Sequence, residues 1–327
     1  MHTPSLRVLA GLASSVALLA ACGQPGAETS TTSTTGTASP AAAGSGEREV
    51  ASLSPRLVMS HEQGLTTIDT RTGKKHKTAA PHHGVAFELG DGSLITTQGT
   101  QESRSTVQVL KDGKVVAETR DCPGVHGEAA AKPTATGDTA VFGCTNGPVV
   151  YRDGAFHKVK VADAYSRSGN LAGGHDWPVV LGDYKVDKAA KQERPTRAAL
   201  IDTRTATLST VDVGSPYWFR SLARGPHGEG LVLTYDGSVK VIDPQTRKVT
   251  ASIKAIEPWQ EKEDWQQPGP AITVSGFKAY VTDADHRRLT VIDLSAGTVD
   301  KTFDLPHVPV EVAVVNGRLE TTGSHRH

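Results

Sequence analysis

The chain has 327 residues, and its 35 basic and 35 acidic side chains give a formal net charge of zero. This balance argues against nucleic acid as a partner, because proteins that bind nucleic acid usually carry a basic patch. Glycine and proline are frequent, at 33 and 18 residues, whereas aromatic residues make up 5% of the chain. The composition therefore predicts many turns and few long helices.

The N-terminus is typical of the signal of an exported bacterial lipoprotein. Arg7 provides a positive charge, and an apolar stretch runs from Val8 to Ala21. This stretch is too short to span a bilayer, which takes about 20 apolar residues, but it fits a secretory signal. It ends in Leu-Leu-Ala-Ala before Cys22, a pattern that resembles the lipobox. We expect residues 1–21 to be removed and Cys22 to carry a lipid that anchors the protein outside the cytoplasmic membrane; a secreted protein with a chance cysteine is the alternative.

A linker follows the predicted lipid anchor. Residues 24–47 contain mainly Ser, Thr, Gly, Ala and Pro, with no aromatic residue, Leu, Ile or Val. Such a segment buries too little apolar surface to offset the entropy lost on ordering, so we expect residues 22–47 to act as a flexible tether. A folded domain is expected over residues 48–323, and residues 324–327 form a short His-containing tail.

Beyond the linker, the chain repeats a unit of short strands with a period of about 40 residues. The strands are apolar and β-branched, and the joins between them are rich in Gly, Asp and Asn. Several strands end in Ile-Asp, where the Asp side chain can cap its own backbone in a turn. The clearest copies comprise residues 230–253 and 278–303, and partial copies occur at 56–73 and 198–205.

Four-stranded units of this length, repeated in line, predict an all-β fold of the β-propeller type. Two strands expected between Val310 and Thr322 would be completed by residues 56–80, which closes the ring at six blades. Seven blades follow if residues 47–55 supply a further strand, and a sandwich of two β-domains is the alternative. Full units begin near His83, His126, Ser166, Trp218 and Trp265.

The cysteines indicate one disulfide. Once Cys22 carries a lipid, Cys122 and Cys144 remain. Outside the cytoplasm a disulfide between these two is the natural interpretation, and a thiolate metal site is the alternative. We expect the disulfide to join adjacent strands of neighbouring blades. Closing a loop of this length contributes about 3 kcal/mol to stability on the chain-entropy model.

Histidines recur near the expected start of the innermost strand in three units, where a propeller binds ligands at the mouth of its channel. Equivalent positions in a ring converge on the axis, so these imidazoles could together bind zinc with a carboxylate from Glu128 or Glu311. For each histidine taken alone, a role as a turn residue or hydrogen-bond partner stays open. The predicted zinc ligands are His83 and His126, with His82, His307 and Glu128 as further ligands. Glu128 lies two positions beyond His126, and in a strand this spacing places both side chains on the same face.

No catalytic motif accompanies these histidines. The sequence contains no His-Glu-x-x-His, no Gly-x-Ser-x-Gly and no Gly-rich phosphate loop. An enzyme acting on glycans would need an acid–base pair, which no pattern reveals. We therefore expect a protein that is not an enzyme. A metal-free propeller that serves as a scaffold for protein interactions at the cell surface is the alternative to a zinc-binding protein.

Several motifs resemble the AztD-type zinc metallochaperone family. The most specific is Cys-Pro-x-x-His-Gly-Glu, which begins at Cys122, and the resemblance extends from about residue 56 to residue 315. It is carried by residues 81–89, 121–129, 142–147, 179–185 and 264–268.

The resemblance implies a propeller that binds zinc outside the cytoplasmic membrane and delivers it to the solute-binding protein of a zinc ABC importer. It also implies that Cys122 and Cys144 pair, and that His126 and either His82 or His83 occupy the family's His motifs. Members of the family carry an additional N-terminal section with a His- and Asp-rich loop. Here the linker leads directly into Arg56, so we expect a domain that is shortened at its N-terminus.

Overall fold

The computed structural model describes residues 56–61, 64–69, 74–79, 85–100 and 102–314. All the regular elements in these ranges are β-strands. The described part of the chain therefore contains no helix long and apolar enough to cross a membrane. The predicted signal, Cys22 and the linker lie outside the described residues.

The strands of the described residues form six antiparallel sheets, five with four strands and one with three. The three-stranded sheet consists of β1 (Arg56–His61), β2 (Gly64–Asp69) and β3 (Lys75–Ala79). The next two sheets consist of β4 (Ala86–Glu88), β5 (Leu94–Gly99), β6 (Arg104–Lys111) and β7 (Lys114–Thr119), and of β8 (Glu128–Thr134), β9 (Gly137–Phe142), β10 (Val149–Arg152) and β11 (Ala155–Lys158). The last three consist of β12 (Leu171–Ala172), β13 (Val179–Asp183), β14 (Arg197–Asp202) and β15 (Thr207–Asp212), of β16 (Leu222–Arg224), β17 (Gly230–Leu233), β18 (Ser238–Asp243) and β19 (Lys248–Lys254), and of β20 (Ala271–Ser275), β21 (Lys278–Asp283), β22 (Arg288–Asp293) and β23 (Thr298–Asp304).

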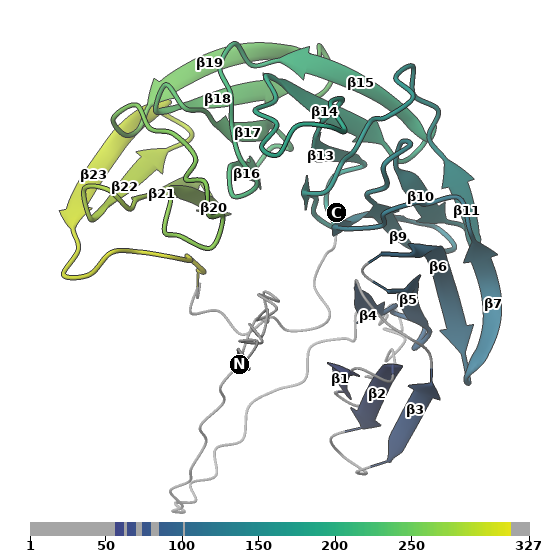
Figure 1. Ribbon diagram of the computed structural model, residues 1–327. Coiled ribbons are helices and arrows are strands. Elements are labelled where there is room, and N and C mark those ends of the chain that lie inside the picture. The colour runs from purple at the N-terminus through teal and green to yellow at the C-terminus, as the bar shows by residue number, and fades with distance from the viewer. Residues whose placement is uncertain (1–55, 62–63, 70–73, 80–84, 101, 315–327) are drawn as a thin grey trace, which may run out of the picture. The chain divides into compact units, whose positions relative to one another are not determined.

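The four-stranded sheets are the blades of a β-propeller, as predicted. In each of them, neighbouring strands in the chain are neighbours in the sheet. Figure 1 shows these sheets following one another around an arc, with β4, β16 and β20 on the inside. Strands β8 and β12 are the corresponding first strands of the other two sheets. Contacts between β7 and β11, β8 and β12, β13 and β16, β16 and β20, and β19 and β23 join successive blades. The expected repeat starts are confirmed as well, because each precedes the innermost strand of one blade.

The predicted closure of the ring needs one correction. Strands β1, β2 and β3 lie between Arg56 and Ala79, so one further strand, and not the expected pair, would complete a sixth four-stranded blade. Residues 305–314 contain no strand. Residues 315–322 lie outside the described residues, and the closing strand therefore stays a prediction.

The Ile-Asp pairs end strands in the way the sequence predicts. The Oδ1 atom of Asp202 accepts the backbone N–H of Arg204 at 3.0 Å. The Oδ1 atom of Asp243 accepts that of Gln245 at 2.7 Å. Each of these aspartates closes a turn with its own side chain, so the repeat encodes its turns locally.

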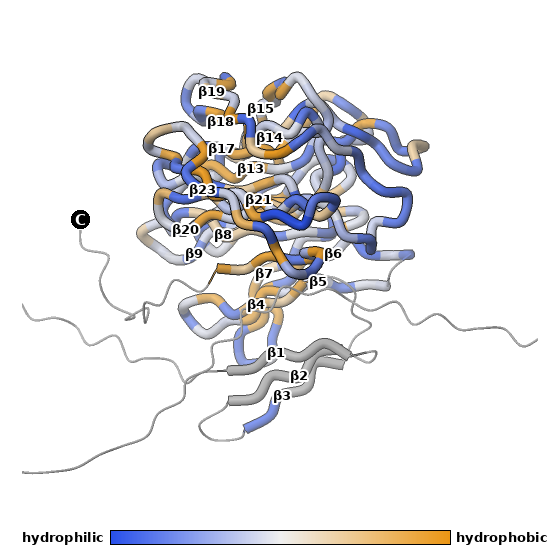
Figure 2. The backbone as a smooth tube through the Cα atoms, turned by 90° about the vertical axis from the view of Figure 1, so that its left-hand side faces the viewer, coloured by the Kyte–Doolittle hydropathy of each residue, from blue (hydrophilic) through white to orange (hydrophobic). Residues whose placement is uncertain are grey.

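The core is divided among the faces between successive blades. Four clusters of buried apolar residues lie between the five four-stranded sheets, one at each interface. Figure 2 shows hydrophobic stretches along strands such as β13 and β17. A fully buried Leu, Ile or Phe contributes about 1.5–3 kcal/mol relative to the same residue in water. Stability thus comes from stacking each blade on its neighbours, as in other repeat architectures.

Candidate functional site

The predicted site residues divide into two groups. Cys22, His82 and His83 lie outside the described residues. The structure describes the other predicted residues, which are Cys122, Cys144, His126, Glu128 and His307.

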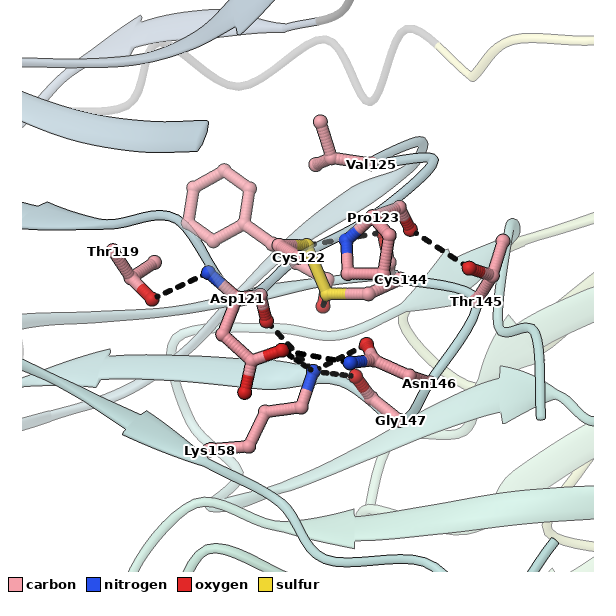
Figure 3. The surroundings of a disulfide bond; sticks show 12 residues. Thr119, Asp121, Cys122, Pro123, Val125, Cys144, Thr145, Asn146, Gly147 and Lys158 are labelled. Atoms are coloured by element: carbon pink, nitrogen blue, oxygen red, sulfur yellow. Dashed lines mark hydrogen bonds and ion pairs between the residues drawn. A yellow bond between two sulfur atoms is a disulfide. The ribbon is translucent and has the colours of Figure 1, made fainter. Parts of the chain in front are cut away.

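Cys122 and Cys144 form the predicted disulfide, with their Cα atoms 4.9 Å apart (Figure 3). Cys122 lies between β7 and β8, and its backbone N–H donates to the carbonyl oxygen of Ser105 in β6 at 3.0 Å. Cys144 follows β9 in the next blade. The bond therefore links neighbouring blades, but neither cysteine belongs to a strand, so the expectation that it joins two strands is wrong. Both cysteines are fully buried in the core between these blades.

A half-buried lysine ties together the chain on both sides of the disulfide. The Nζ atom of Lys158 in β11 donates to the carbonyl oxygens of Asp121 and Gly147, both at 2.8 Å, and to Oδ1 of Asn146 at 2.6 Å (Figure 3). The Nδ2 atom of Asn146 donates in turn to Oδ1 of Asp121 at 2.7 Å. Burial lowers the pKa of Lys158 to about 8, against the opposing effect of Asp121. This network fixes the segment that leads to His126.

The backbone of His126 is held directly against the end of the neighbouring strand β9. Its N–H donates to the carbonyl oxygen of Gly143 at 3.0 Å, and the N–H of Gly143 donates to the carbonyl oxygen of Gly127 at 3.1 Å. A side chain at Gly143 would overlap with the carbonyl oxygen of Ser168 and approach that of His126 to 2.6 Å. Glycine is therefore required there for the close approach that places His126.

The ring of His126 is oriented by the next blade. Its Nδ1 atom lies 3.1 Å from the carbonyl oxygen of Gly169, which precedes β12. A carbonyl oxygen can only accept, so Nδ1 carries the proton in the neutral ring. The lone pair is then on Nε2, which is the atom that could bind a metal ion. Histidine ligands are usually oriented in this way, through a hydrogen bond from the other ring nitrogen.

The surroundings of His126 favour its neutral form. Nearby protein atoms remove water from the ring of His126, and this burial lowers its pKa below the usual value of 6.5. Part of the residue's surface nevertheless remains exposed. The carbonyl of Gly169 and the carboxylate of Asp183 act in the opposite direction, and the guanidinium groups of Arg167 and Arg104 lower the pKa further. A neutral imidazole is the form that binds zinc.

Glu128 does not share a strand with His126. Strand β8 begins at Glu128, and Gly127 has a φ angle of 80°. The alternation of side chains along a strand therefore does not extend to His126, and the expectation that it places both side chains on one face is wrong. Removal of water by neighbouring atoms raises the pKa of Glu128, which has no hydrogen-bond or ion-pair partner among the described residues.

His307 lies in the segment that follows β23. Its side chain is exposed, and no strand follows it within residues 305–314. The predicted equivalence of His307 with His126 rests on a strand beyond residue 314, outside the described residues, so it stays a prediction.

The described residues contain part of a zinc site at most. Within residues 85–100 and 102–314, no group of three or more His, Cys, Asp or Glu side chains is close enough together to hold a metal ion. His126 fits a ligand role, because its Nε2 lone pair is available, and Glu128 has an unpartnered carboxylate nearby in the chain. A complete tetrahedral site would need further ligands, which His82 and His83 are predicted to supply.

Arginines at this mouth of the propeller are the residues that the sequence reasoning missed. The Nε atom of Arg104 donates to the carbonyl oxygen of Val125 at 2.8 Å. The guanidinium group of Arg167 packs so closely on Gly169 that a Cβ atom there would lie 2.9 Å from its Cζ. Arg167 and Arg220 both occur shortly before the innermost strand of a unit, so the repeat itself carried a signal that could have identified them.

Comparison with known proteins supports the same fold and finds a similar protein that is named a zinc chaperone. No protein-family model matches the chain. The chain is 22% identical over 295 residues to the zinc chaperone AztD of Citrobacter koseri, which covers 86% of this chain. The match spans 64% of the relative's length.

Solved structures show the same architecture. The apo and a second crystal structure of Citrobacter koseri AztD superpose with TM-scores of 0.61 and 0.62, at 19% and 20% identity, over 78% of this chain and 71% and 70% of theirs. BamB from Moraxella catarrhalis superposes with a TM-score of 0.52 at 14% identity, over 80% of this chain and 77% of its own. The similarity in sequence over most of the chain, together with these structures, confirms the resemblance to the AztD-type zinc metallochaperone family that the motifs indicate.

Proposed function

We propose that this chain is a zinc-binding chaperone, held outside the cytoplasmic membrane by a lipid on Cys22, that delivers zinc to the solute-binding protein of a zinc ABC importer. Two observations support the proposal. The chain is similar over 86% of its length to a protein named as a zinc chaperone, and His126 presents an available Nε2 atom. Because that relative is named a chaperone, we also propose that the chain is not an enzyme.

The observation that carries the proposal is the orientation of His126. The hydrogen bond between its Nδ1 atom and Gly169 assigns the lone pair to Nε2, and the pKa of the ring lies below its usual value. The ring is therefore neutral at physiological pH and ready to accept a cation without releasing a proton. Nearby guanidinium groups oppose the cation, so zinc would be held loosely enough to be passed on.

Zinc titration against a chromogenic chelator tests the proposal on the chain expressed from residue 23 onward. We expect one zinc ion per chain, and binding at least about tenfold weaker after His126→Ala or His83→Ala. His175→Ala is a matched control, because His175 is an exposed histidine that follows β12. It therefore lies at the opposite end of this strand from Gly169, which contacts the ring of His126. If both ligand variants bind zinc as tightly as the unchanged chain, the site lies elsewhere.

A metal-free scaffold for protein interactions is the second candidate. It is favoured by the lack, within the described part of the chain, of a group of three metal-binding side chains. Failure of the unchanged chain to bind zinc in the same titration would support this candidate.

Delivery of zinc is tested separately. The zinc-loaded chain is mixed with an apo solute-binding protein of a zinc importer, and the zinc in each protein is measured after separation.

A further inference from the structure

Arg220 is a second notable group at the mouth of the propeller that holds His126. It lies two positions before the start of β16, as His126 lies two positions before the start of β8, and both strands are the innermost of their blades. Because innermost strands of a propeller run in the same direction, these two residues lie at the same end of the channel.

The guanidinium group of Arg220 rests on a rigid aromatic surface. Its Cζ atom lies 5.2 Å from the ring centroid of Trp218 and 4.7 Å from that of Phe219. Trp218 is buried, and its Nε1–H donates to the carbonyl oxygen of Pro270 at 2.7 Å. Stacking of a guanidinium group on aromatic rings is favourable and holds its plane in one orientation.

This arginine has more hydrogen-bond donors than the described residues use. Its side chain is 9% exposed, and its Nη2 atom lies 2.6 Å from Oε1 of Glu311. The Nε and Nη1 atoms are buried and have no acceptor among the described residues. Leaving buried charged donors unpaired is unfavourable, whereas a carboxylate can accept two parallel N–H groups from one guanidinium fork.

Glu311 reaches Arg220 from the segment that follows β23. Its side chain remains 62% exposed. Within residues 306–314, the pair with Arg220 is the one hydrogen bond or ion pair that the structure provides. The neighbouring residues Val308 and Val310 are exposed at 47% and 44%. The group that contacts Arg220 thus comes from a weakly attached segment, in which the glutamate is flanked by apolar residues.

We propose that Arg220 anchors a carboxylate-binding site at this mouth, which receives an acidic side chain of a protein partner and which Glu311 occupies when no partner is bound. Once Glu311 leaves, Nη2 together with the neighbouring Nε gives an incoming carboxylate a bidentate geometry that the present contact lacks. An apolar surface lies alongside, because Trp265 is 50% exposed and its ring packs against that of Phe219 with the centroids 6.1 Å apart. The site therefore fits a glutamate or aspartate next to an apolar side chain, as in Glu311's own segment.

Intramolecular competition gives the proposal a measurable consequence. A tethered group acts at an effective concentration in the millimolar range, so a free peptide must compete with Glu311. The probe is acetyl-Pro-Val-Glu-Val-amide, which copies residues 309–312. Its binding to the full chain is followed by tryptophan fluorescence, because Trp218 lies under Arg220. The proposal goes beyond zinc chaperoning, and the measurement requires no zinc.

We expect the Glu311→Gln variant to bind the peptide at least about tenfold more tightly than the unchanged chain, because the internal competitor is removed. The same peptide with glutamine in place of glutamate should not bind. Adding Arg220→Lys to Glu311→Gln should abolish this gain in peptide affinity, because lysine keeps the charge but lacks the planar donor fork of arginine. Circular dichroism checks that this variant is folded.

Equal peptide affinity in the unchanged chain and in Glu311→Gln would overturn the proposal, even if the lysine variant does not fold. Glutarate binding as tightly as the peptide would overturn the assignment to a protein partner.

Discussion

The Nδ1 atom of His126 lies 3.1 Å from the carbonyl oxygen of Gly169, a residue 43 positions later that belongs to the next blade. The contact couples the orientation of the imidazole to the packing of two blades. It also determines which ring nitrogen faces a ligand.

The first prediction concerns the protonation of His126 in the zinc-free protein. Burial lowers its pKa, so its ring should titrate below 6.5 in an NMR titration, with the assignment made by the His126→Gln variant. A group that is harder to protonate in the folded state than in the unfolded state destabilises the fold as pH falls below its unfolded value. The free energy of unfolding should therefore fall with decreasing pH below about 6.5, and less so in His126→Gln. A midpoint at or above 6.5 contradicts this account.

The second prediction concerns the glycine that lets two blades meet at His126. A Cβ atom at Gly143 would overlap with the carbonyl oxygen of Ser168. The Gly143→Ala substitution must therefore push the backbone segments at Gly143 and Ser168 apart. We expect a loss of about 3 kcal/mol or more in the free energy of unfolding. Gly174→Ala is the matched control, because its Cβ atom would meet only Trp177, at 3.9 Å. Similar unfolding midpoints for the two variants in urea would show that the region can relax.

The third prediction concerns the bond between neighbouring blades. Replacing Cys122 and Cys144 together by serine removes a cross-link over 22 positions. On the chain-entropy model the loss is about 3 kcal/mol, and the buried serine hydroxyl groups add to it. Urea unfolding of the variant and of the oxidised protein measures the difference. Two freely alkylated thiols in the unreduced native protein would show that the bond does not form there.

Local features of the fold could be predicted from the sequence. Strands and turns follow from apolar, β-branched runs that end in Asp, because Asp202 and Asp243 close their turns with neighbours only two positions away. The starts of the repeat units could also be predicted, because they follow from the same local pattern of strands and turns. An error arose where a single glycine changes direction: with Gly127 at φ 80°, the strand pattern does not extend back to His126.

Contacts between distant segments could not be predicted from the sequence. The pairing of His126 with Gly169 depends on how two blades pack, and the pairing of Arg220 with Glu311 depends on where the chain returns after β23. Neither has a local sequence signal. The balanced net charge gave no indication of the arginines at one end of the molecule, and only their repeated position before innermost strands could have identified them.

The fourth prediction concerns the anchor, which lies outside the described residues. Cys22→Ala should leave the protein without lipid and poorly processed, because the Leu-Leu-Ala-Ala-Cys sequence ends in the residue that receives the lipid. Labelling of cells with a radioactive fatty acid measures the modification. Equal labelling of the unchanged protein and the variant would exclude Cys22 as the attachment site.

The fifth prediction tests whether the arginines tune the zinc site. Arg167 lowers the pKa of His126 through its positive charge, and the same charge should repel a zinc ion on Nε2. Arg167→Gln should therefore raise the pKa of His126 in the zinc-free protein. It should also tighten zinc binding, by roughly two- to tenfold at low ionic strength and less at high salt.

A matched variant separates this local effect from a change in net charge. Arg194→Gln removes the same charge from an exposed residue between β13 and β14, and it should change neither quantity. The two readouts also separate two possible failures. A raised pKa with unchanged zinc affinity would place zinc away from His126, because any cation on Nε2 must experience the charge that the proton experiences. An unchanged pKa would mean that solvent screens Arg167 from the ring, and the looseness of the zinc site would then need another cause.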